Sequence, residues 1–116
     1  MKITLLGEPK STNNIYKYHC KFGFPSGYLS AEGKKLKEDY QWQAKSQCKE
    51  KISNKPFEIE IKLFFKRDGK HDIDNYGKLL LDSLTGIVWE DDNQIFKQTV
   101  SKWQDKNNPR IEITII

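Results

Sequence analysis

Acidic side chains are concentrated in one part of the chain, where they could hold a metal ion. Residues 68–92 carry seven acidic and two basic side chains, whereas residues 1–67 carry seven acidic and 14 basic ones. The 116-residue chain is basic overall, with a formal net charge of +4. A basic protein attracts polyanions, but a local group of carboxylates repels them. A divalent cation bound between these carboxylates and a phosphate would remove that conflict.

The candidate ligands come from two separate stretches. Asp72 and Asp74 belong to the first, and Asp91 and Asp92 belong to the second. Magnesium prefers oxygen ligands, takes only a few protein carboxylates, and completes its shell with water and substrate phosphate. Two carboxylates from one stretch and a third from the other therefore suit Mg²⁺, or Mn²⁺ in its place. Such an ion polarises a phosphoryl oxygen and lowers the pKa of an attacking water.

Lys78 is placed to assist this chemistry. The pattern predicts a helix from about Asp74 to Leu84, on which Asp74, Lys78 and Asp82 follow one another at four-residue intervals along one face. The opposite, buried face would carry Ile73, Tyr76, Leu80, Leu84 and Ile87. Lys78 would then face the charge that develops on the phosphate, an interaction typically worth ~3–4 kcal/mol.

Each of these features also has a structural explanation. Asp-x-Asp before a helix often caps it. Residues Asp74, Lys78 and Asp82 could form ordinary helical ion pairs worth ~0.2–0.5 kcal/mol each. Asp91-Asp92-Asn93 is a good turn sequence. Their joint occurrence in a basic chain favours a site.

The elements that must position these residues follow from the apolar pattern. Ser30 is a suitable N-cap for the first helix, and a strict apolar alternation marks the central strand. We expect strands at 2–6, 57–65, 95–103 and 110–116 and helices at about 30–52 and 74–84. The order β-α-β-α-β-β predicts a single α/β (α+β) domain over residues 1–116, with two main helices packed on a mixed sheet.

Residues 8–29 show no regular period and predict a long loop. Its bases, among them Lys17 and Lys21, alternate with aromatic residues, so it could follow a DNA backbone and stack on bases. Its aromatic residues could equally fold back onto the core. The two cysteines, Cys20 and Cys48, fit no metal or redox motif and are expected as reduced thiols in a cytoplasmic protein. We expect no signal peptide, no membrane-spanning segment and no organic cofactor.

The acidic stretches resemble the RusA family of Holliday-junction resolvases, and the likeness extends over nearly the whole chain. The matching segments are Asp72-Ile73-Asp74-Asn75 with Lys78, then Asp82, Leu84 and Thr85, then Trp89-x-Asp91-Asp92 with Gln94 and Ile95, and, nearer the N-terminus, residues 9–14 and 30–33. The resemblance implies a homodimeric, magnesium-dependent endonuclease that places paired symmetrical nicks in four-way DNA junctions. Such enzymes act in recombination and repair, and their genes are often carried by prophages.

The resemblance also implies roles for individual residues. Asp72, Asp74 and Asp92 match the family's metal-binding carboxylates, and Lys78 matches its catalytic lysine. Asp91 is the alternative to Asp92, since two adjacent acids cannot easily point at one ion. Family members often carry an arginine-rich run just before the first aspartate. In this chain, residues 66–71 form a weaker positive run at that place. The residues expected to contact DNA are Lys17, Lys21, Lys66, Arg67, Lys70 and Asn75.

Three other interpretations remain open. Glu60 and Lys62 form an acid-x-lysine pair, as in restriction-type nucleases, although alternating charges on an exposed strand explain them equally well. The chain could instead be a non-catalytic module that binds branched DNA and uses its acids as caps. A zinc site could use four residues whose spacing is not diagnostic, namely His19, Cys20, Cys48 and His71.

Overall fold

The predicted site lies in the connection between two parallel strands. The computed structural model describes residues 1–11, 16–21 and 24–116, and only the backbone of residues 16–21 and 24–28. Its elements are β1 (Lys2–Leu6), β2 (Tyr16–Lys21), β3 (Phe24–Leu29), α2 (Ala31–Gln47), β4 (Phe57–Phe65), the 3₁₀ turn η1 (Ile73–Asn75), α3 (Lys78–Leu84), the 3₁₀ turn η2 (Asp92–Gln94), β5 (Ile95–Gln104) and β6 (Arg110–Ile115).

Four strands form the main sheet in the order β1-β6-β4-β5. β6 pairs antiparallel with both β1 and β4, whereas β4 and β5 are parallel, so the sheet is mixed as predicted. Parallel neighbours need a long crossover connection. Here that crossover consists of η1, α3 and η2, which together carry all the candidate metal ligands.

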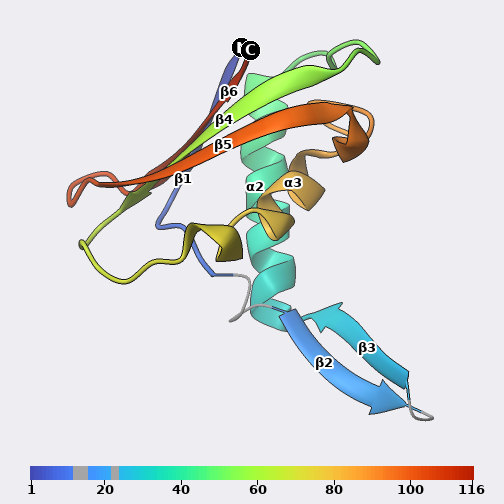
Figure 1. Cartoon of the computed structure of the whole chain (residues 1–116), viewed down its shortest axis with the longest axis vertical. Coiled ribbons are helices and arrows are strands. Elements are labelled where there is room, and N and C mark those ends of the chain that lie inside the picture. Colours follow the sequence, from blue (N-terminus) through green and yellow to red (C-terminus); the bar gives the residue numbers. More distant parts are fainter. Residues whose placement is uncertain (12–15, 22–23) are drawn as a thin grey trace.

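Both helices cover the same face of the main sheet (Figure 1). Alternate residues of β4 point toward them, and this alternation leaves Ile59, Ile61 and Leu63 at most 1% exposed. Trp89, just before η2, is fully buried. Its ring lies 5.3 Å from that of Phe57, and its indole nitrogen donates a 3.0 Å hydrogen bond to the Thr85 hydroxyl. The α+β architecture inferred from the sequence is confirmed.

The prediction of a long irregular loop at 8–29 was wrong. Strands β2 and β3 form an antiparallel hairpin that projects away from the main sheet, below α2 in Figure 1. Tyr16, Tyr18 and Cys20 alternate with Lys17, His19 and Lys21, as in a strand, whereas Pro25 and Gly27 interrupt the second strand. The first strand therefore had a local signal in the sequence, whereas the pairing of the two strands could not be read from it.

The first predicted helix begins as expected but ends earlier. The backbone N–H of Gly33 donates a 3.1 Å hydrogen bond to the hydroxyl of Ser30, the N-cap. The helix ends at Gln47 rather than near residue 52, although Cys48 is still buried and Ile52 still packs against the core. Cys48 is a free thiol.

The second predicted helix is divided in two. The Asp72 carboxylate accepts a 3.1 Å hydrogen bond from the backbone N–H of Asp74, which closes the separate turn η1. A new helix, α3, starts only after Gly77. Asp74 is therefore not on the same helix as Lys78 and Asp82, and the expected three-residue ladder is reduced to its last two members.

Candidate functional site

Asp72 and Asp74 lie on a segment that is held from several sides. The side chain of Lys102, on β5, donates a 3.1 Å hydrogen bond to the backbone carbonyl of His71. The imidazole of His71 stacks on the ring of Phe65 with centroids 3.8 Å apart and an interplanar angle of 3°. Asp72 and Asp74 themselves are exposed. The carboxylates of Asp72 and Asp74 therefore face solvent, while the backbone just before them is held by Lys102 and Phe65.

Tyr76 completes this anchor. Its hydroxyl lies 3.4 Å from Nδ1 of His71, and its ring meets Phe65 edge-on, with centroids 5.2 Å apart. Burial raises the pKa of Tyr76, and the negative charges of Glu8 and Asp72 raise it further. A phenol is neutral near pH 7 even at its ordinary pKa, so Tyr76 acts there as a hydrogen-bonding group without charge.

A second group of carboxylates lies at the start of β5. Asp91 caps η2, because its side chain accepts a 3.0 Å hydrogen bond from the backbone N–H of Asn93. The side-chain oxygen of Gln94 accepts in return from the backbone N–H of Asp91, at 3.0 Å. Partial desolvation raises the pKa of Asp92, and a hydrogen bond with Asp91 and the charges of Asp91 and Asp82 raise it further.

Desolvation is the largest cause of the raised pKa of Asp92, and the negative charges of Asp91 and Asp82 add to it. Like charges at close range disfavour the ionised form, and a bound cation would reverse that effect. Asp91 is engaged as the cap of η2, but Asp72 is engaged in the same way at η1, so capping does not separate the candidate ligands. The capping interpretation considered for the acids thus holds for Asp91 and for Asp72, each of which closes a 3₁₀ turn.

The two carboxylate groups do not meet within the chain. Within residues 1–11, 16–21 and 24–116, no three acidic, histidine or cysteine side chains gather closely enough to hold a metal ion. The expected convergence of Asp72, Asp74 and Asp92 inside one chain is therefore not found. Lys78, exposed at the first position of α3, follows η1 in the chain and precedes η2.

The parallel crossover explains this separation. Lys102, which holds the segment before Asp72, lies seven residues beyond Ile95, or roughly 23 Å along β5 at the usual strand rise. Asp92 belongs to the turn that ends immediately before Ile95. Lys102 thus ties the residue before Asp72 to the far half of β5, whereas Gly77, after η1, lies beside the Gln98 side chain nearer the middle of the strand.

Basic side chains surround the first group. Lys66, Arg67 and Lys70 are exposed in the loop that leads to Asp72. One hollow of the surface is lined by Glu8, Lys66, Arg67 and His71, and an adjoining one by Phe65, Arg67, Asp68, His71, Lys102, Trp103 and Gln104. Asn75 is half-buried in η1. The side chains of Lys17 and Lys21, and those of His19 and Cys20 in the zinc interpretation, lie outside the described residues.

Glu8 and Lys102 were not identified from the sequence as members of this region. The Glu8 carboxylate accepts a 2.8 Å hydrogen bond from the backbone N–H of Lys66, 58 residues away. Lys102 donates to the carbonyl of His71, which precedes it by 31 residues in the sequence. Neither residue belongs to a local motif, so the only available signal was the expected strand containing Lys102.

The alternative nuclease pair lies elsewhere. Lys62 and Glu60 form an ion pair with atoms 3.9 Å apart, and both point to the sheet face opposite the helices. Both side chains are more than a third exposed, so the pair is worth little energetically. This arrangement agrees with ordinary charge alternation on a strand.

Comparison with known proteins identifies the family. No curated protein matches the sequence. The family model of the endodeoxyribonuclease RusA matches residues 7–116, all but the first six residues. RusA proteins are hydrolases that resolve Holliday junctions and generally depend on a divalent metal. Within the described residues, no helix is long and apolar enough to cross a membrane. The chain therefore belongs to the RusA family of Holliday-junction-resolving endodeoxyribonucleases.

Proposed function

We propose that this protein is a cytoplasmic, homodimeric, Mg²⁺-dependent endonuclease that resolves four-way DNA junctions by paired symmetrical nicks during recombination and repair. The family match over residues 7–116 carries the proposal. Two exposed groups of carboxylates on the β4–β5 crossover add support. Mn²⁺ is expected to replace Mg²⁺, since both are hard cations with oxygen ligands.

The proposed ligands are Asp72 and Asp74 from one group and Asp92 from the other. Within the described residues, no three acidic, histidine or cysteine side chains gather closely enough to hold an ion, so these three do not form a site within one chain. A second copy of the chain can supply the missing group. A twofold dimer then has two equivalent sites, each with Asp72 and Asp74 from one protomer and Asp92 from its partner.

Two sites related by a twofold axis match a substrate that must be cut twice. A four-way junction presents strands at symmetry-related positions, and a fixed separation between sites sets where both nicks fall. Lys78 contributes positive charge beside the phosphate, and it acts on the charge that develops during hydrolysis. The metal, when bound, polarises the phosphodiester and activates water.

The surrounding bases position the DNA. Lys66, Arg67 and Lys70 border the segment that carries Asp72, so their charges can bind phosphates next to the cut. Asn75, together with Lys17 and Lys21 of the hairpin region, completes the proposed DNA contacts. Such contacts contribute affinity rather than sequence preference, and they weaken as salt increases.

The direct test compares a synthetic four-way junction with a linear duplex of the same arm sequence, each with and without Mg²⁺. We expect paired nicks in the junction only, and only when the metal is present. Binding to the junction without any nicking would support the non-catalytic alternative instead. Cleavage that persists in excess chelator would contradict the proposed metal dependence.

Two neutral substitutions separate the candidate sites in the same assay. Asp74→Asn is expected to abolish nicking, whereas Glu60→Gln on the opposite sheet face should leave it unchanged. The reverse outcome would move the chemistry to the pair Glu60 and Lys62. Equal junction affinity for both variants is the control that each still folds and binds.

A further inference from the structure

The main sheet has one face that no described helix covers, because α2 and α3 both lie on the other face (Figure 1). Alternate residues of β4 and β5 point to this open face. Most of them are polar or charged, among them Glu60, Lys62 and Ser101, as expected of a sheet face in water. Two aromatic side chains of the open face, Phe64 and Trp103, depart from that pattern.

Phe64 and Trp103 form a pair across neighbouring strands. They are partners in the register of β4 and β5, their ring centroids are 6.3 Å apart, and their rings are 23° from parallel. The indole nitrogen of Trp103 donates a 2.9 Å hydrogen bond to the Ser101 hydroxyl, which fixes the rotation of the ring. The guanidinium carbon of Arg110 lies 3.9 Å from the Phe64 centroid and covers that ring. Trp103, on the edge strand, remains 51% exposed and is open to a ligand.

Positive charge gathers around the ring of Trp103. The ammonium of Lys62 lies 5.6 Å from the centroid of the indole. Trp103 also lines one of the two surface hollows described above, together with Arg67, Lys102 and the acidic Asp68. Two bases thus outnumber one acid in that hollow, and Lys62 adds a further positive charge beside the ring. These surroundings suit a phosphate group next to whatever covers the indole.

The ring is close to the segment that carries the candidate metal ligands. Lys102, the residue before Trp103, donates to the carbonyl of His71, the residue before Asp72. An exposed aromatic ring among cationic side chains is typical of surfaces on which nucleobases stack while their phosphates are bound alongside. A base inside a duplex is covered by its neighbours on both faces, so this ring requires a base that has lost one neighbour.

We propose that Trp103 stacks on one nucleobase at the branch point of the four-way junction. The inference rests on the proposed function and adds a base-contacting subsite to it. Unstacking a base costs free energy, least where pairing is already interrupted. The branch point therefore supplies this base more readily than a duplex arm does. Because every base has a flat face, the contact favours branched over linear DNA without a preference for one base.

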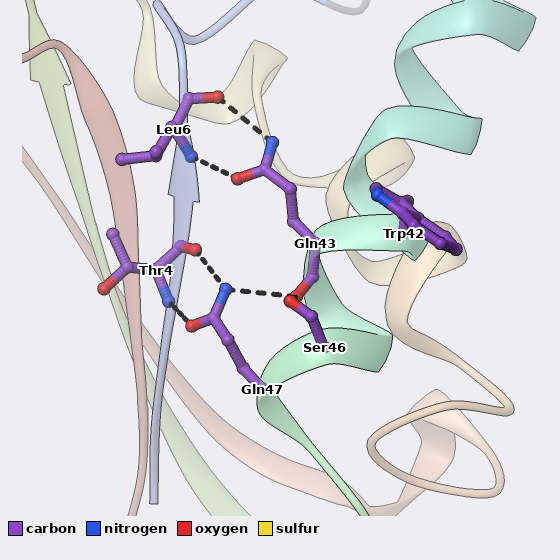
Figure 2. Close-up of a pocket in the computed structure, with 6 residues that line it drawn as sticks. All are labelled: Thr4, Leu6, Trp42, Gln43, Ser46 and Gln47. Atoms are coloured by element: carbon purple, nitrogen blue, oxygen red, sulfur yellow. Dashed lines mark hydrogen bonds between the residues drawn. The ribbon is translucent and has the colours of Figure 1, made fainter.

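Trp42 offers a matched control beside the other edge of the sheet. It is 75% exposed and lines a hollow beside β1 whose lining residues are all uncharged (Figure 2). Two glutamines of α2 close this edge. Gln47 accepts a 2.8 Å hydrogen bond from the Thr4 N–H and donates a 2.6 Å bond to the Thr4 carbonyl. Gln43 makes the same pair of bonds with Leu6, at 2.7 Å and 3.3 Å. Trp42 is thus an exposed indole without cationic surroundings.

Tryptophan fluorescence tests the contact in excess chelator, where binding is measured without cleavage. The chain has three tryptophans, and Trp89 is fully buried. A nucleobase stacked on an indole quenches its emission. A synthetic four-way junction should therefore quench the Trp42→Phe protein, in which Trp103 is the exposed indole. It should quench the Trp103→Phe protein far less, because that variant keeps only Trp42 and the buried Trp89.

A linear duplex of the same arm sequence is the control for the DNA. It should leave the emission of the Trp42→Phe protein nearly unchanged, since its bases stay stacked on one another. Equal quenching by duplex and junction would overturn the inference, because the ring would then contact groove or backbone. Quenching that is lost in Trp42→Phe and kept in Trp103→Phe would overturn it as well.

Junction affinity provides a second measurement. Trp103→Ala should weaken binding about tenfold, within the usual range for one stacked base. Trp103→Tyr should recover most of that loss because it keeps an aromatic ring, whereas Trp103→Leu, apolar but not aromatic, should not. Trp42→Ala should bind as the wild type does. A Trp103→Leu protein with wild-type affinity would contradict stacking and indicate a merely apolar surface.

The inference and the nuclease proposal fail by different results. If the junction quenches Trp103 but is never nicked with Mg²⁺, the stacking subsite stands and the proposed function falls. If the junction is nicked while Trp103→Ala changes neither quenching nor affinity, the function stands and the subsite falls.

Discussion

Lys102 and His71 connect the far half of β5 to the residue before Asp72. The Lys102 ammonium donates to the His71 carbonyl at 3.1 Å, across 31 residues of sequence. The Phe65 ring holds the His71 side chain from another direction. The position of Asp72 therefore depends on a strand that follows it in the chain.

Replacing Lys102 with methionine should slow junction cleavage about fivefold, because a single hydrogen bond contributes ~1 kcal/mol. We expect the loss in the rate at saturating junction rather than in affinity, and little change in melting temperature. Lys97→Met is the control, since Lys97 lies on the same strand and pairs with Glu58. Equal losses in the two variants would indicate a general effect of charge on DNA binding.

Lys78→Ala should reduce the cleavage rate by ~10²–10³, because its charge acts on the transition state. Junction affinity should change far less, since the ground state gains little from the same contact. Single-turnover kinetics and a binding titration separate the two quantities. A parallel loss of rate and affinity would reassign Lys78 to phosphate binding.

The double variant Gln43→Ala/Gln47→Ala should expose the β1 edge. We expect species larger than the dimer in sedimentation, together with a loss of ~4 kcal/mol in unfolding free energy, because four hydrogen bonds to β1 are broken at ~1 kcal/mol each. Gln41→Ala, on the same helix, is the control and should retain the wild-type distribution. Unchanged assembly in the double variant would show that the β1 edge is protected by something else.

Arg110 should govern stability in acid. Its hydrogen bond lowers the pKa of Asp105, and hydrogen bonds from Lys2 and then Arg110 lower the pKa of Glu112. A lowered pKa in the folded state contributes stability above the ordinary carboxyl range of about 4, and this contribution disappears as pH falls through the lowered values. Arg110→Gln should therefore flatten the decrease in melting temperature between neutral pH and about pH 2. If the melting temperature of Arg110→Gln decreases in acid as steeply as that of the wild type, this assignment is contradicted.

The sequence predicted the elements whose signals are local. The alternation from Phe57 to Phe65 identified β4, and Ser30 marked the start of α2. The β2–β3 hairpin was missed although Tyr16 to Lys21 alternate as in a strand, because Pro25 and Gly27 interrupt the second strand. The break at Gly77 was missed because the Asp72 cap and the helix pattern compete, and only the folded backbone shows which prevails.

Candidate site residues could be chosen by type and spacing, but their positions could not. Asp72 and Asp92 are 20 residues apart in sequence, and the sequence does not reveal that β5 is a parallel edge strand. Within the described residues, the two groups do not form a three-ligand metal site in one chain. The contacts of Lys102 and Glu8 could not be predicted from the sequence either, because both join segments that are distant in the chain.

The central claim is that carboxylates from two protomers form each site, and mixing two inactive variants tests it most directly. Asp74→Asn and Asp92→Asn proteins should each fail to nick a four-way junction with Mg²⁺. After denaturation and refolding together, half of the dimers are heterodimers, each with one intact site. The account predicts that about a quarter of all sites in the mixture are intact, and that each active dimer nicks one strand per junction. A mixture that remains inactive although heterodimers form would contradict it.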